Sequence, residues 1–125
     1  MSGELLRLSH KSRPLHMVEK ELVCAMLSEA PKAENLLSAL ETRRVADMSD
    51  GGMGSIRFIA DTEENRLLGH PIATAECLDS DNVVISIAIT VDNRGDLYEI
   101  DLWKVDFSPL RSYPRPGNLR NIVMQ

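Results

Sequence analysis

VVISIAITV, residues 83–91, is the stretch of sequence that decides the fold. Large aliphatic side chains occupy every second position, and smaller or polar side chains stand between them. That period is typical of a β-strand with one face buried in a core. A slip of one residue would turn every aliphatic side chain to the opposite face, so the segment also constrains how its neighbours pair with it.

Further strand-like segments surround this one, and helical segments precede it. Residues 43–48, 55–60, 70–78 and 97–105 have strand character and are separated by clusters of Gly, Asp, Asn and Ser. Before them, residues 14–28 show the apolar spacing of an amphipathic helix, with Ser12 as its cap, and a shorter helix restarts at Pro31. We therefore expect an α+β fold, with N-terminal helices packed on one face of a mostly antiparallel five-stranded meander.

The turns on either side of the central strand predict its register. A four-residue loop over 92–95, in which Gly95 supplies a positive φ, would place Ile87 opposite Ile100. A three-residue loop over 79–81 would align the small residues of the preceding strand with the same aliphatic face, against which the long helix packs. This register also places Tyr98 on the helix side and, on the opposite face, His70, Ile72 and Leu97.

The face away from the helices combines the single tryptophan with several charged residues, namely Trp103, Glu76, Glu99, Asp101 and Arg57. Tryptophan is enriched in binding hot spots, so a shallow protein-recognition surface is one interpretation. The other is an ordinary solvated sheet face with cross-strand charge pairs.

Apolar residues continue along this nominally polar face through Trp103, Val105 and Phe107. So much apolar surface requires a cover. Either the C-terminal arm folds back over it, with Tyr113 and Leu119, or another protein chain covers it. In the second case the chain would associate with a partner or with a copy of itself.

Length and composition exclude several classes of function. The 125 residues suffice for one domain, which we expect over 13–110 between a frayed N-terminus (1–12) and an arm (111–125) that contains Pro and Arg. A net charge of −5 and five aromatic residues argue against nucleic-acid binding. No apolar run reaches the roughly 20 residues of a membrane span, and two cysteines indicate a reducing cytoplasm.

The most glycine-dense stretch is the candidate for an alternative site. Backbone N–H groups of Asp50, Gly51, Gly52, Gly54 and Ser55 could cradle an anion, with Asp47 nearby. The stretch lacks the lysine of a phosphate loop and the dinucleotide fingerprint. A tight or bulged connection between two strands is the competing interpretation.

Residues capable of catalysis are scattered. His10, His16 and His70 lie on different predicted elements, and Cys77 falls on the core face. A general base and its orienting carboxylate need hydrogen-bond contact, which this arrangement does not provide. We expect no catalytic residue, no metal site and no cofactor.

Two strings resemble a family of short bacterial proteins of unknown function. They are VADMSDGGMGSIRF (45–58) and GDLYEIDLWKVDFSPL (95–110), and the opening Arg13-Pro14-Leu15 is similar too. The resemblance spans about residues 13–110 and implies a bacterial source and an α+β domain. It implies no activity, cofactor or catalytic residue.

These observations favour a non-catalytic protein-binding module. Residues 46–105 carry four basic and twelve acidic side chains, a balance of −8, which suits a basic partner. Small acidic bacterial domains often act as immunity proteins, so by analogy the module is immunity-like. The alternative is a small-ligand or anion-binding protein, or an enzyme, that uses the loop 50–55.

Overall fold

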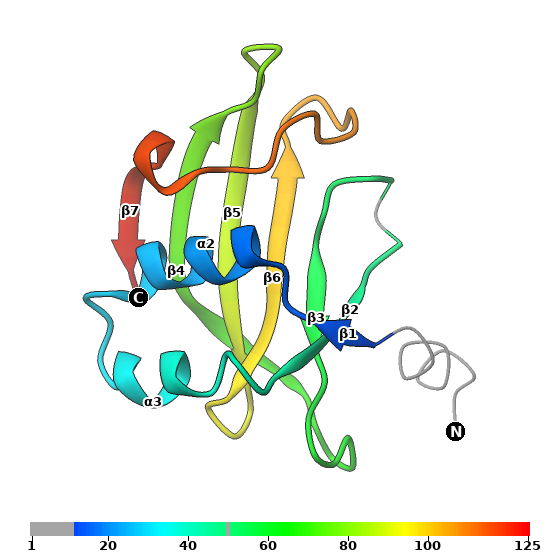
Figure 1. The fold of residues 1–125 in the computed structure, drawn as a ribbon, viewed down its shortest axis with the longest axis vertical. Coiled ribbons are helices and arrows are strands. Elements are labelled where there is room, and N and C mark those ends of the chain that lie inside the picture. The colour runs from blue at the N-terminus through cyan, green and yellow to red at the C-terminus, as the bar shows by residue number, and fades with distance from the viewer. Residues whose placement is uncertain (1–11, 50) are drawn as a thin grey trace.

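A single antiparallel sheet organises residues 12–49 and 51–125, which are the residues that this computed structural model describes (Figure 1). Its seven strands are ordered β1-β2-β3-β6-β5-β4-β7. Two helices and one 3-10 turn complete the described elements. The bounds are β1 (Arg13–Pro14), α2 (Met17–Leu27), α3 (Ala33–Ser38), β2 (Arg44–Asp47), β3 (Ile56–Phe58), β4 (Leu68–Leu78), β5 (Val84–Asp92), β6 (Leu97–Lys104), η1 (Pro116–Asn118) and β7 (Arg120–Met124).

The α+β class and the antiparallel sheet are confirmed, but the expected five-stranded meander is wrong. Only β4, β5 and β6 form a meander, because β3 pairs with β6 rather than with β4. Two further strands, β1 and β7, extend the sheet at its edges. Both were missed for physical reasons: β1 has two residues, and β7 follows a proline-containing segment that reads as a loop.

Both helices lie on one face of the sheet (Figure 1). Helix α2 begins at Met17, three residues later than the expected start, because Arg13 and Pro14 pair with β2 instead. The Glu19 carboxylate accepts the His16 backbone N–H, and Arg13 binds both Glu19 and Asp47. Arg13 thereby ties the start of α2 to β2.

The side-chain faces of the central strands follow the sequence pattern, although the register differs. Ile87 lies opposite Ala75 and Leu102, each two residues from the expected alignment. A shift of two keeps every side chain on its expected face. Gly95 has φ +87°, as expected, but the strands close at Val91 and Leu97, so the connection is longer than the expected four-residue loop over 92–95.

β-bulges overturn four of the expected faces. The register shifts by one between Thr90 and Val91, so Leu97 instead of Tyr98 is buried in the core. Two irregularities in β4 turn His70 and Ile72 toward the helix side. A bulge inserts one residue and re-aims the side chains beside it, which an alternating pattern cannot reveal.

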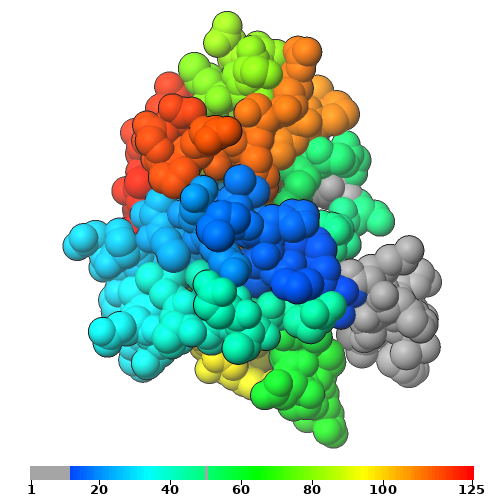
Figure 2. Space-filling model, in the orientation of Figure 1, coloured from blue at the N-terminus to red at the C-terminus, as the bar shows by residue number. Residues whose placement is uncertain are grey.

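The C-terminal arm is integral to the fold. It crosses the helix side, above α2 in the view of Figure 2, and ends in β7, which pairs with β4. The Lys104 ammonium is buried and contacts Asp79 (2.9 Å), Asp81 (2.7 Å) and the Pro109 carbonyl (3.2 Å). Because the Arg111 N–H also donates to Asp79, this buried cation fixes the point where the arm leaves β6. The five strands expected from the sequence did not include this tail.

Candidate functional site

The sheet face away from the helices carries most of the predicted site. Trp103 on β6 lies beside Ser86 on β5, which lies beside Glu76 on β4. In the next row Asp101 lies beside Ala88. The register therefore places Trp103, Glu76 and Asp101 in adjacent rows of one surface.

An apolar patch occupies one end of this face, and we call it the outer patch. Trp103 is 42% exposed, Val105 49% and Phe107 71%. The Trp103 and Phe107 rings lie 5.8 Å apart in a tilted arrangement. Among the described residues, no helix covers the patch (Figure 1). Its members are Leu78, Val84, Trp103, Val105 and Phe107.

Phe107 holds its place in the outer patch at a conformational cost. Its φ is +63°, in the left-handed region that bulky residues rarely adopt. Glycine or asparagine would adopt this conformation more cheaply. An exposed aromatic side chain in a strained backbone is the kind of outlier that clusters at functional positions.

Charged groups on this face divide into paired and unpaired sets. Arg57 forms an ion pair with Glu99 (3.2 Å), and Arg120 lies 3.5 Å from Glu76. Asp101 accepts a hydrogen bond from the Ser55 hydroxyl, and no described cation pairs with it. The excess charge beside Trp103 is therefore negative.

Asp106, in the turn after β6, adds a second negative charge next to Phe107. Hydrogen bonds from the Ser108 hydroxyl and backbone N–H lower the pKa of the Asp106 carboxyl. It is therefore ionised at neutral pH. The predicted site residues thus separate into a Trp103 end with surplus acid and a compensated Arg57–Glu99 pair in a neighbouring row.

The C-terminal arm does not cover the outer patch. Tyr113 and Leu119 pack against the hydrophobic core on the helix side, so this choice between the two expected covers is wrong. Burial raises the pKa of the Tyr113 hydroxyl, and its oxygen has no hydrogen-bond partner. The arm thus closes the core and leaves the patch open.

The glycine-dense loop connects β2 to β3. Asp50 lies outside the described residues, whereas Gly51, Gly52 and Gly54 all have positive φ. The Gly52 carbonyl accepts the Leu110 N–H, and the buried Ser55 hydroxyl accepts the Leu102 N–H. These groups of the alternative site are therefore engaged in holding β3 and the arm against β6.

Asp47, the other acidic residue considered for that site, is occupied as well. Hydrogen bonds and charge attraction from Arg13 lower the pKa of the Asp47 carboxyl. Its two oxygens accept from the Arg13 guanidinium at 2.8 and 3.2 Å. Asp47 thus serves the junction between α2 and β2.

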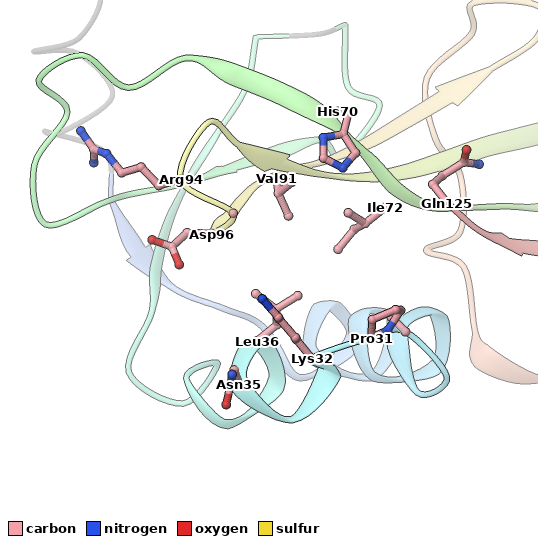
Figure 3. A pocket seen from close by; sticks show the side chains of 12 residues that line it. Pro31, Lys32, Asn35, Leu36, His70, Ile72, Val91, Arg94, Asp96 and Gln125 are labelled. Carbon is pink, nitrogen blue, oxygen red and sulfur yellow. The ribbon is translucent and has the colours of Figure 1, made fainter.

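A pocket that the sequence did not indicate lies on the helix side. It has a volume of about 470 Å³ and opens between α3, β4 and the turn that joins β5 to β6 (Figure 3). Its walls come from four segments distant in sequence, and two wall residues, His70 and Ile72, are the ones that the β4 irregularities turn toward the helices. The sequence carries no usable signal for this pocket, because the alternating pattern predicted that His70 and Ile72 face away from the helices.

Comparison with known proteins gives one match. The family model described as "Domain of unknown function (DUF6984)" matches residues 12–114. The chain belongs to this family. Neither a curated protein nor a solved structure matches it.

In this DUF6984 chain the potentially reactive side chains are dispersed. Cys77 is buried beneath the sheet, and burial raises the pKa of its thiol, so it behaves as a small apolar residue. Cys24 is exposed on α2. Within residues 12–49 and 51–125, no three His, Cys, Asp or Glu side chains converge as metal ligands. The described part of the chain also contains no helix that is long and apolar enough to span a membrane.

Proposed function

We propose that this DUF6984 chain is a non-catalytic protein-binding module whose outer patch docks a basic, apolar segment of another protein. The observation that carries the proposal is the exposed pair of Trp103 and Phe107 on a sheet face that the described helices and arm leave open. Aromatic anchors in a partly apolar surface with a polar rim are typical of interface centres.

The strained backbone of Phe107 supports this assignment. A fold under no other constraint would favour glycine or asparagine at this turn, since either relieves a cost of about 1–2 kcal/mol. The ring at this position buries little surface within the chain. The Phe107 ring therefore contributes little to folding, and we assign its role to contact with another protein.

Charge selects the class of partner. Asp101 and Asp106 flank the patch, and no cation of the described residues forms an ion pair with either carboxylate. A second copy docked by a two-fold axis would bring these carboxylates close to their equivalents, which is unfavourable. Lysine or arginine on a different protein would instead meet unpaired acid, so we assign the patch to a basic partner. Toxin neutralisation in the manner of an immunity protein is one such role.

The alternative function at the glycine-dense loop has less support. The Gly52 carbonyl, the Ser55 hydroxyl and the Asp47 carboxylate already bind partners within the chain, so a ligand that used these groups would have to displace those partners. Displacing satisfied hydrogen bonds costs affinity unless the ligand replaces each of them.

Selection from a displayed random-peptide library tests the proposal. Wild-type protein serves as bait and Trp103→Ala as the counter-selection, with Leu67→Ala, which truncates an exposed leucine outside the outer patch, as the matched control. We expect peptides rich in Lys or Arg with apolar residues, which bind wild type and Leu67→Ala but not Trp103→Ala. Acidic peptides, or peptides that bind Trp103→Ala equally well, would overturn the proposal.

A further inference from the structure

The pocket beside α3 has the size and lining of a small-molecule site. Its volume of about 470 Å³ lies within the range of about 300–1,000 Å³ that is usual for ligand pockets. It lies on the helix side of the sheet, whereas the outer patch lies on the opposite side. The pocket is thus a separate feature from the proposed docking surface.

Apolar side chains form the inner surface of the pocket. Val91 on β5 is buried, Ile72 on β4 is half-buried, and Leu36 on α3 faces them from the other wall (Figure 3). Ala30 and Pro31 continue the same wall. A ligand that fills the pocket must therefore present apolar surface to this floor.

Two basic side chains face each other across the pocket. His70 projects from β4 and Lys32 projects from the turn before α3 (Figure 3). No described side-chain or backbone acceptor binds the Lys32 ammonium or the His70 ring. Lys32 also holds a left-handed backbone conformation, φ +62°, which costs a lysine more than a glycine.

The other charged residues at the pocket are Arg94 and Asp96. Arg94 extends away from it and donates to the carbonyls of Thr62 and Glu64 (Figure 3). Asp96 also lines the pocket, and no ion pair among the described residues joins its carboxylate to Lys32. Lys32 therefore remains the cation without a counter-ion at this pocket.

We propose that this pocket binds a small organic anion with an apolar body, such as a medium-chain carboxylate. The anionic group lies between Lys32 and His70, and the apolar body lies on Ile72, Val91 and Leu36. An inorganic anion would leave the apolar floor exposed to water, and an uncharged apolar molecule would gain nothing from the exposed Lys32 ammonium. A ligand with an anionic group and an apolar body can use both the Lys32 ammonium and the apolar floor.

Four probes separate these contributions. Hexanoate carries both characters, acetate has the charge without the body, hexan-1-ol has the body without the charge, and hexylammonium has the opposite charge. Each is titrated into the full chain, and amide chemical shifts are followed by NMR. We expect saturable binding of hexanoate with a dissociation constant of about 1 mM, and much weaker binding of the other three.

Substitutions locate the site. Lys32→Gln removes the ammonium and should weaken hexanoate binding about tenfold, whereas Lys20→Gln, the same change on α2 outside the pocket, should not. His70→Gln should weaken binding less than Lys32→Gln does. The shifted amides should include those of Ile72, Val91 and Lys32.

Several results would overturn the inference. They are equal affinity for hexanoate and hexan-1-ol, shifts confined to amides away from the pocket, no saturation with hexanoate, or equal weakening by Lys20→Gln and Lys32→Gln. Trp103→Ala should leave hexanoate binding unchanged, because Trp103 lies on the other side of the sheet. This result distinguishes a failure here from a failure of the proposed docking surface.

Discussion

The same three strands, β4, β5 and β6, present two very different faces. Toward the helices they place Ile85, Ile87 and Ile89, which are fully buried beneath α2 and the arm. Away from the helices the neighbouring positions hold Ser86 and Ala88, and the aromatic pair of Trp103 and Phe107 stays exposed. One face of the sheet therefore provides the core, while the other is free to be specialised.

Buried charged side chains lie near both ends of the sheet. Arg66 is buried at one end, where its guanidinium binds Asp92 at 2.9 Å and donates to the carbonyls of Phe58 and Leu97. Lys104 is buried at the other end with Asp79. Buried charges near both ends of the sheet are paired within the chain, whereas no described cation forms an ion pair with Asp101 or Asp106 on the open side.

The largest expected effect on the free energy of unfolding concerns the buried Arg66. Arg66→Met keeps most of the side-chain volume but leaves the Asp92 carboxylate and two carbonyls without their donor. Breaking a buried pair in this way should lower the free energy of unfolding by about 3–5 kcal/mol, measured by urea denaturation. A loss below about 1 kcal/mol would show that this end of the core is open to water.

The two faces of β5 can be compared at adjacent residues. Ile87→Ala should lower the free energy of unfolding by about 2–5 kcal/mol, because it removes buried methyl and methylene groups and leaves a cavity. Ser86→Ala, on the open face, should change it by less than about 0.5 kcal/mol. Similar effects at both positions would contradict the division of the sheet into a covered and an open face.

Acid should act through the buried carboxylates. Burial alone would raise the pKa of Asp92, but hydrogen bonds from Arg66 and from the Arg94 and Asp96 N–H groups outweigh it and lower that pKa. A lowered pKa stabilises the fold above the unfolded value of about 3.9, and this stability is lost as the pH falls through the folded value.

Unfolding free energy should therefore hold from neutral pH down to about 5 and fall below about 4. Asp92→Asn should be less stable at neutral pH and should lose less on acidification. An unchanged acid response in Asp92→Asn would exclude this carboxylate as its cause. Measurement of thermal unfolding from pH 7 to 3 checks both statements.

A smaller loss of stability is expected from a substitution in the turn that joins β5 to β6. Gly95 has φ +87°, and a Cβ atom there would meet no neighbour within 4 Å. Gly95→Val should therefore cost about 1 kcal/mol or more through backbone strain alone. An unchanged melting temperature would remove this turn as a determinant of the β5–β6 register.

The alternation of residues 83–91 was sufficient to predict which side chains form the core. Ile85, Ile87 and Ile100 are all buried as expected, even though the strands pair two residues away from the predicted register. Burial depends on which face a side chain occupies, and a shift by two leaves that face unchanged. The pattern carries no comparable information on where the turns close.

The bulges and the edge strands could not be predicted in this way. His70 and Ile72 face the helices because the backbone of β4 is irregular, and alternation assumes a regular backbone. β7 pairs with β4 at the end of an arm whose start is held by the buried Lys104–Asp79 contact, and this contact joins residues far apart in the chain. The candidate site was predicted as a group of outward residues, but its division into paired and unpaired charges required coordinates.

The most direct test of the open face is the free energy of unfolding of Phe107→Gly, measured by urea denaturation and circular dichroism. The substitution removes an aromatic ring that is 71% exposed and relieves a backbone with φ +63°. If the outer patch contributes little to folding, the free energy of unfolding of the variant should lie within about 1 kcal/mol of the wild-type value or exceed it. A loss of about 3–5 kcal/mol, the cost of an aromatic truncation in a core, would make Phe107 structural and contradict the docking surface.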